Sequence, residues 1–251
     1  MKQILLVIGL CMASLSCTAP PAKQPVDYVD PFIDSHKSRW IYFSSASRPF
    51  GMVNLSPDTW VRGTWNSGYM YDSMHVRCFS HIHAWQMAGI PVMPTSGEFR
   101  GHLGMEANKS SFSHDNEMAK PGYHQVYLED YDINAELTST LRAGFHRHTF
   151  PEGRDNYILF DVGAFLAHGP TTAANIFRVD DTEIAGYSLI GSTRRRPKDT
   201  YVYFVARFDR PFEKFAGWKN GEILETNNIE GENIGGYVQF NTEADDPVLI
   251  K

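Results

Sequence analysis

The strongest constraint on the fold is a long alternation of apolar and polar residues between Ile133 and Phe150, in the segment INAELTSTLRAGFHRHTF. Side chains of a β-strand point alternately to opposite faces, so a period of two residues places one apolar face against a core. The segment therefore predicts a half-buried pair of strands rather than a helix. We expect two opposite faces, one formed by Ile133, Ala135, Leu137, Leu141, Ala143 and Phe145, the other by Asn134, Glu136, Thr138, Thr140, Arg142, His146 and His148.

Strand patterns recur along most of the chain. YILFDVGAFL is continuously apolar, as in a strand covered on both faces, whereas TYVYFVARFDRPF alternates; GGYVQFN and DPVLIK predict further short strands. Turn-forming stretches such as PEGRDN and WKNGE separate them, and helical periodicity over ten or more residues is absent after the N-terminal segment. The sequence predicts an all-β protein, a large antiparallel β-sandwich with few or no long helices, formed as one domain over residues 26–251.

The N-terminus predicts export. Residues 1–17 combine Lys2, an apolar run and small residues, which is typical of a signal peptide. The sequence SLSC resembles a bacterial lipobox and predicts lipidation of Cys17; ordinary cleavage after Ala19 is the alternative. Residues 18–25 then form a Pro-rich tether. We expect an exported protein of a Gram-negative bacterium, an outer-membrane lipoprotein at the periplasm or cell surface, in contact with the membrane only through its lipid.

Charge and cysteine count argue against nucleic-acid binding, an internal disulfide framework and a thiolate zinc site. The net charge of −6 lacks the positive field that a phosphate backbone requires, so nucleic acid is not an expected partner. A chain that begins at Cys17 has Cys78 as its other cysteine, so no internal disulfide framework is available and the fold depends on its core. A thiolate zinc site is disfavoured for the same reason.

The segment CFSHIHAWQMAGIPVMP concentrates residues that carry chemistry. In an extended chain His81, His83 and Trp85 point to one face, and His146 and His148 repeat the H-x-H spacing. Two such pairs could together hold a metal ion, although no carboxylate has matching spacing. A nucleophile formed by Ser80 or Cys78 beside a histidine is disfavoured, because neighbouring residues of a strand point to opposite faces.

Sugar binding suits these residue types better. Hydroxyl groups require polar donors and acceptors, and the C–H faces of sugars lie on aromatic rings. The segment PDTWVRGTWNSGYMYD adds acids, amides and rings within a short span. The alternative is that some of these residues pack in the core or fix loops; for His146 and His148 we expect a structural or interdomain role. Predicted sugar-binding residues are Trp65, Asp58, Tyr69, His81, His83 and Trp85, and no metal ligand is assigned.

Six motifs in order carry a family resemblance: YVDPFID, RPFGMVNLSPDT, SGYMYD, FSHIH with a following VMP, KPGYHQVYLEDYDINAELTSTLRAGFHRHTFP and VYFVARFDRPFEKF. Together they resemble the N-terminal domain of glycoside hydrolase family 92, calcium-dependent exo-acting α-mannosidases. The resemblance implies a β-sandwich that packs on an (α/α)6 domain, which carries the acid and base carboxylates and most calcium ligands. It also implies an inverting reaction, a mannose-containing glycan as substrate, and an active site between the two domains.

This resemblance orders the functional hypotheses. The first is that the chain helps to shape the sugar-binding site of a glycan-degrading hydrolase and is inactive without its own C-terminal catalytic domain. DDPVLIK ends on a strand pattern, so we expect a fragment in which that domain is missing. The family's GTGGHGH loop is replaced here by DSHKSRWIYFSSASRPFGM, and AWQMAGIPV is shorter than its counterpart, so the pocket should differ. The alternatives are a free-standing carbohydrate-binding lipoprotein and a metal-binding β-sandwich enzyme that uses His81/His83 and His146/His148.

Overall fold

The computed structural model describes residues 22–37, 45–62 and 67–251. The predicted signal peptide, Cys17, the first half of the tether and Trp65 lie outside the described residues, so their roles stay predictions. The described part of the chain holds no helix of the length and apolarity needed to cross a membrane. Its helices are all short: η1 (Pro25–Tyr28), η2 (Gly101–Leu103), α1 (Met105–Asn108) and η3 (His114–Asn116).

The largest sheet has seven strands in the order β1-β3-β6-β12-β19-β16-β17, and its described pairs are antiparallel. At its centre β12 has five buried residues in succession, which confirms the strand that the continuous apolar run predicted. The strands are β1 (Ser56–Asp58), β3 (Cys78–Ser80), β6 (Val92–Ser96), β12 (Asn156–Phe160), β16 (Lys214–Lys219), β17 (Glu222–Leu224) and β19 (Ile234–Phe240).

Two further sheets have the orders β20-β11-β10-β9-β8 and β15-β14-β13-β18. Small pairs join β2 (His75–Val76) to β7 (Ser110–Ser111) and β4 (Ile82–Ala84) to β5 (Met87–Gly89). The five-stranded sheet contains β8 (Glu117–Lys120), β9 (Tyr123–Leu128), β10 (Ile133–Ser139), β11 (Gly144–Thr149) and β20 (Val248–Ile250). The four-stranded sheet contains β13 (Thr171–Arg178), β14 (Glu183–Ile190), β15 (Thr200–Arg207) and β18 (Asn228–Gly231).

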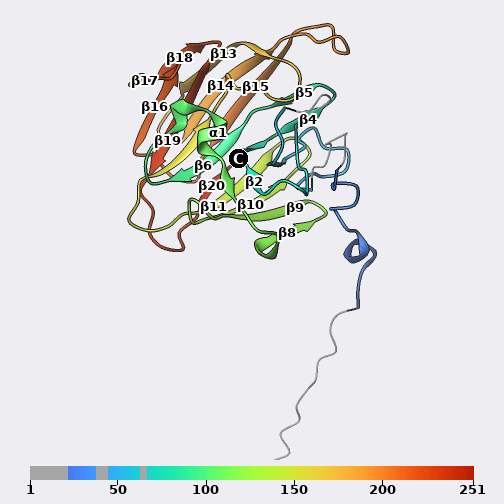
Figure 1. Cartoon of the computed structure of the whole chain (residues 1–251). Coiled ribbons are helices and arrows are strands. Elements are labelled where there is room, and N and C mark those ends of the chain that lie inside the picture. The colour runs from blue at the N-terminus through green and yellow to red at the C-terminus, as the bar shows by residue number, and fades with distance from the viewer. Residues whose placement is uncertain (1–21, 38–44, 63–66) are drawn as a thin grey trace, which may run out of the picture.

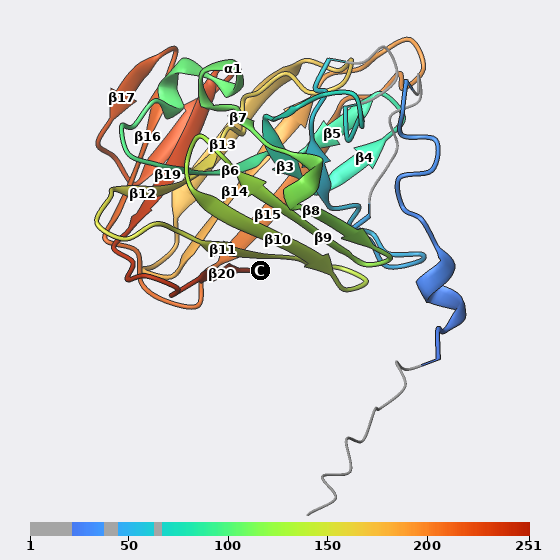
Figure 2. The same cartoon turned by 60° about the horizontal axis from the view of Figure 1, so that its bottom comes forward.

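Both of these sheets pack on the same face of the seven-stranded sheet. Phe79 and Phe160 each pair in register with Val92, so the three side chains lie in one row on one face. Phe79 contacts His146 and His148 of the five-stranded sheet, and the ring of Phe160 stacks on Phe204 of the four-stranded sheet at 5.9 Å. Figure 1 shows the four-stranded sheet in the upper part of the view and the five-stranded sheet below it, and Figure 2 brings the five-stranded sheet forward; the two sheets adjoin where Arg207 and Lys251 exchange backbone hydrogen bonds at 2.9 Å.

The opposite face of the seven-stranded sheet is covered by the segment that leads into η2 and α1. There Phe99 contacts Tyr157 at 5.3 Å and Tyr237 at 4.2 Å between ring centroids. Because both faces of the central strands are buried, their sequences do not alternate between apolar and polar residues. The predicted all-β sandwich is confirmed, and residues 22–37, 45–62 and 67–251 contain no long helix.

One detail of the predicted hairpin is wrong. β10 buries Ile133, Ala135 and Leu137 as expected, but β11 buries His146 and His148 and leaves Phe145 half-buried. Ser139 pairs with Gly144, so a four-residue turn separates the strands, and the side-chain parity changes across it. The two histidines therefore lie on the core face, where His146 pairs with Leu137 and His148 pairs with Ala135.

Candidate functional site

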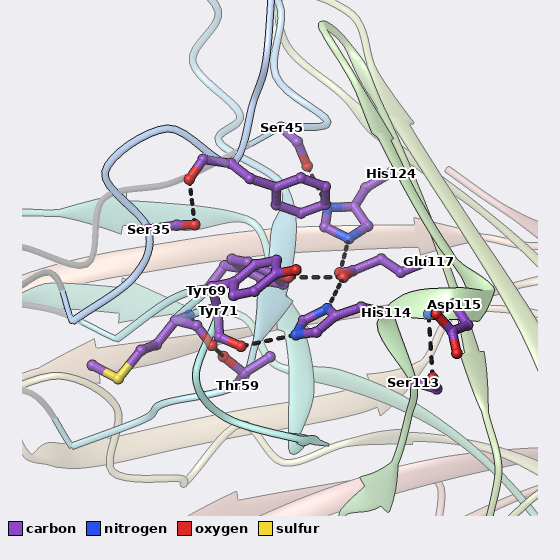
Figure 3. Close-up of polar contacts among 12 residues, drawn as sticks. Ser35, Ser45, Thr59, Tyr69, Tyr71, Ser113, His114, Asp115, Glu117 and His124 are labelled. Carbon is purple, nitrogen blue, oxygen red and sulfur yellow. Dashed lines mark hydrogen bonds and ion pairs between the residues drawn. The ribbon is translucent and has the colours of Figure 1, made fainter.

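The buried carboxylate of Glu117, the first residue of β8, accepts hydrogen bonds from three side chains. Glu117 accepts hydrogen bonds from His114 Nδ1 at 2.6 Å, His124 Nε2 at 2.8 Å and the hydroxyl of Tyr69 at 2.8 Å (Figure 3). His124 comes from β9 and is fully buried, and its Nδ1 is hydrogen-bonded to the hydroxyl of Ser45. The network thus ties the segments that hold residues 45 and 69 to the five-stranded sheet.

The electrostatics of this network are set by its donors. Burial opposes the charge of Glu117, but the hydrogen bonds and charges of its partners, above all His124, lower the pKa of this carboxyl. Burial, followed by the nearby Glu117 charge, raises the pKa of Tyr69. His114 also faces the carbonyl of Tyr71 through Nε2 at 3.0 Å, so both of its ring nitrogens point at acceptors. Glu117 is consequently committed as an acceptor, which suits a positioning role.

The network positions an aromatic cluster near the N-terminus of the domain. Phe32 lies 5.6 Å from both Tyr69 and Tyr71 between ring centroids, and the rings of Tyr71 and His114 stack at 3.9 Å. Asp72 pairs with His36 Nδ1 at 2.7 Å and accepts the backbone N–H of Lys37 at 2.6 Å. The segment around residues 32–37 is therefore held against residues 69–72.

A second buried network joins Asp58, on β1, to His83, on β4. Asp58 Oδ1 lies 3.0 Å from His83 Nε2, and its Oδ2 accepts the backbone N–H of Ser80 at 2.9 Å. His83 Nδ1 donates to the carbonyl of Asn54 at 2.6 Å. Burial opposes the imidazolium, but the charge and hydrogen bond of Asp58 and the Asn54 carbonyl raise the pKa of His83. The pair is a buried ion pair with both ring nitrogens engaged.

This second network is not a nucleophile triad, although the Ser80 hydroxyl lies 3.1 Å from His83 Nε2. In a triad the carboxylate contacts Nδ1 and the hydroxyl contacts Nε2. Here the Asp58 carboxylate and the Ser80 hydroxyl share Nε2, while Nδ1 donates to a carbonyl, so no free lone pair remains to deprotonate Ser80. Burial, followed by the Asp58 charge, raises the pKa of Cys78, which disfavours a thiolate at this position.

Three other histidines form a cluster without a carboxylate. His81 Nδ1 donates to the carbonyl of Ile90 at 2.9 Å, and its Nε2 lies 2.8 Å from His146 Nε2. His148 is fully buried, with its ring centroid 5.3 Å from that of His146. His81 and His146 also line a cavity of about 440 Å³ whose other walls are largely apolar. The two H-x-H pairs therefore do not converge on one point, because His83 turns away to Asp58.

The predicted sugar-binding residues fall into two groups. Trp85, in the turn between β4 and β5, is 39% exposed, and the guanidinium of Arg195 lies over its ring at 5.9 Å. Asp58, Tyr69 and His83 are buried in the polar networks, and His81 is partly buried. The expectation that His81, His83 and Trp85 share one face is wrong, because the chain bends at His81 between β3 and β4.

Glu117, His114 and His124 were not among the residues predicted from the sequence. For His124 a signal exists, because it has the same strand parity as Val126 and Leu128 and therefore lies on the buried face of β9. His114 begins the short helix η3 and Glu117 begins the four-residue strand β8, and neither segment has an apolar alternation in its sequence. In the described part of the chain, no group of three or more His, Cys, Asp or Glu side chains is arranged to hold a metal ion. Trp60, two residues after the buried Asp58 in the sequence, is 43% exposed and adds a second indole at the surface.

Comparisons with known proteins agree with this architecture. The family model described as the glycosyl hydrolase family 92 N-terminal domain matches residues 28–251. The family GH92 α-mannosidase BT3965 from Bacteroides thetaiotaomicron, solved in complex with mannoimidazole, is similar with a TM-score of 0.80 and 28% identity. That match covers 90% of this chain and 31% of the mannosidase.

A second similar structure supports the fold. The family GH92 inverting mannosidase BT2199 from Bacteroides thetaiotaomicron VPI-5482 has a TM-score of 0.77 and 21% identity, over 91% of this chain and 31% of that chain. A search of the curated proteins found no match. The chain thus spans about a third of the length of these mannosidases. By the match over residues 28–251, this chain belongs to the family of glycosyl hydrolase family 92 N-terminal domains.

Proposed function

We propose that this chain is the N-terminal domain of an exported family 92 glycosidase that acts on mannose-containing glycans, and that it shapes the sugar site together with a catalytic domain. The family match over residues 28–251 carries the proposal. The 28% identity to an α-mannosidase of which this chain covers 31% supports both the substrate class and the need for a second domain.

In this proposal the buried networks hold the sugar-facing surface in place. Asp58 and His83 fix β1 and β4, and Glu117 fixes the segment around Tyr69. The partly exposed indoles of Trp60 and Trp85 would then offer ring surface to a sugar. Rigid support of this kind matters because substrate positioning contributes to catalysis only when the bound geometry is held.

The acid and the base of the reaction belong to the second domain in this account. An inverting glycosidase requires one carboxylic acid to protonate the leaving oxygen and one carboxylate to activate water. Asp58 is paired with His83, and Glu117 accepts from three donors, so neither is available for proton transfer. This chain would contribute binding and orientation of the sugar.

Calcium enters the proposal only through the parent enzyme. A calcium site requires six to eight oxygen ligands. We assign no calcium ligand in this chain and no reaction step to a cation; among the described residues no three His, Cys, Asp or Glu side chains form a group that could hold a metal ion.

Trp85→Ala should lower kcat/KM about tenfold when this domain is fused to the part of the BT3965 α-mannosidase that the match does not cover. The loss of a ring face removes roughly 1.4 kcal/mol of binding to the sugar. Mannose release from α-mannobiose measures the rate, and a thermal melt of the isolated domain should shift by only a few degrees, since Trp85 is half-exposed.

Trp218→Ala is the matched control. Trp218 is 2% exposed on β16, so its truncation should cost about 3–5 kcal/mol and lower the melting temperature sharply. A Trp85 variant that behaves like the Trp218 variant would assign Trp85 to packing and remove it from the sugar site.

A further inference from the structure

An exposed aromatic surface lies on the outer face of the four-stranded sheet, whose strands carry none of the predicted sugar-binding residues. The inner face of this sheet packs on the seven-stranded sheet through Phe204. On the outer face, Tyr201 and Tyr203 of β15 are 52% and 71% exposed. Tyr187 of β14 lies beside them, with ring centroids 5.4 Å from Tyr201 and 5.9 Å from Tyr203.

Polar side chains on the neighbouring strands extend the line of these rings across the sheet. Tyr203 pairs in register with Tyr187, Tyr187 with Asn175, and Asn175 with Glu230, so one row crosses β15, β14, β13 and β18. We call these four residues the tyrosine row. Neighbouring strands lie about 4.8 Å apart, which gives the row a length of about 14 Å.

Two hydrogen bonds fix the orientation of the Asn175 amide at the polar end of the tyrosine row. Asn175 Nδ2 donates to Asn228 Oδ1 at 2.8 Å and to the carbonyl of Ile229 at 3.0 Å. Both amide hydrogens are therefore used, and Oδ1 is left to accept a hydrogen bond. The exposed Glu230 carboxylate adds a second acceptor and repels acidic ligands.

We propose that the tyrosine row binds a chain of neutral hexoses, separately from the site at Trp85. Linked sugars present C–H faces to aromatic rings and hydroxyl rims to planar acceptors, which is the order of groups along the row. Two cations near the row are engaged: Lys219 Nζ donates to the carbonyl of Glu230 at 2.9 Å, and Arg207, two rows from Tyr203 on β15, is paired with Glu183 at 2.6 Å. The inference goes beyond the proposed function, because a domain that holds glycan on an open sheet face could bind polysaccharide without its catalytic partner.

Native gel electrophoresis of the purified chain in soluble yeast α-mannan tests this site. We expect the mannan to retard the chain, and Tyr203→Ala and Tyr187→Ala each to weaken binding about tenfold. Val205→Ala is the matched control, since Val205 is exposed on the same face of β15 but in the neighbouring row and without a ring. It should bind mannan as the parent chain does.

Several results would overturn the proposal. The first is absence of retardation of the parent chain, and the second is equal retardation of the Tyr203 and Val205 variants. Retardation lost in Trp85→Ala but kept in Tyr203→Ala would place binding at the candidate site. Sedimentation that shows a dimer which Tyr203→Ala dissociates would make this face a protein interface. Thermal melts of each variant confirm folding, which exposed positions should leave intact.

Discussion

Glu117→Ala should destabilise the domain by about 3–5 kcal/mol at pH 7, because removal of one partner from a buried charged network leaves the others unpaired. His124 would lose its acceptor inside the core, and His114 and Tyr69 would lose theirs. A loss of this size is a large part of the 5–15 kcal/mol that typically stabilises a domain. Unfolding in denaturant, followed by tryptophan fluorescence, measures it.

Glu225→Ala is the control for this measurement. Glu225 pairs with Lys214 at 2.7 Å, but its side chain is 65% exposed, so the change should cost less than about 1 kcal/mol. Similar losses in the two variants would contradict the role of Glu117 as the point that joins the N-terminal segments to the five-stranded sheet.

The free energy of unfolding should fall steeply as the pH drops below about 6.5, the usual pKa of histidine. Burial lowers the pKa of His148 to about 3 and lowers those of His81 and His146 as well. Between the folded and unfolded pKa the unfolded chain binds more protons, so stability rises with pH and reaches its plateau above 6.5. His148 alone should account for a loss of about 1.7 kcal/mol between pH 6.5 and pH 5.

Two other buried groups act in different pH windows. The pKa of Glu117 is lowered, so its contribution is present above the unfolded value near 4.5 and is lost at more acid pH. The pKa of His83 is raised, so its contribution is complete below 6.5 and declines as the pH rises through the folded value. Neither group offsets the fall in the free energy of unfolding between pH 6.5 and pH 5.

His148→Leu isolates the histidine effect. The slope of stability against pH should become shallower by about 1.4 kcal/mol per pH unit, because one titrating group is removed. Ile176→Val, at a fully buried apolar position, should cost about 1 kcal/mol at every pH and leave the slope unchanged. An unchanged slope in His148→Leu would show that His148 is not held neutral by burial.

The fold was predictable because its signals are local. The alternation at residues 133–150 and the apolar run in β12 each reflect which faces a strand buries, and both segments form the strands expected. The face of β11 was not predictable, because it depends on the even length of the turn between Ser139 and Gly144. Sequence alternation alone does not report that length.

The candidate site was predictable in residue type but not in geometry. The segment around His81 and His83 does carry buried polar chemistry, yet a bend at His81 sends the two imidazoles to different partners, His146 and Asp58. Glu117 lies 48 residues from Tyr69 and 7 from His124 along the chain, and only the tertiary fold brings all three together. Long-range polar contacts of this kind leave no periodic pattern in a sequence.

Mannose release from α-mannobiose tests the central claim most directly, measured on this chain alone, on the part of the BT3965 α-mannosidase that the match does not cover, and on a fusion of the two. We predict no release by this chain alone, because Asp58 and Glu117 are committed to structural partners. We predict release by the fusion well above that of the catalytic part alone. Turnover by the purified chain, or a folded fusion no more active than the catalytic part, would contradict the account.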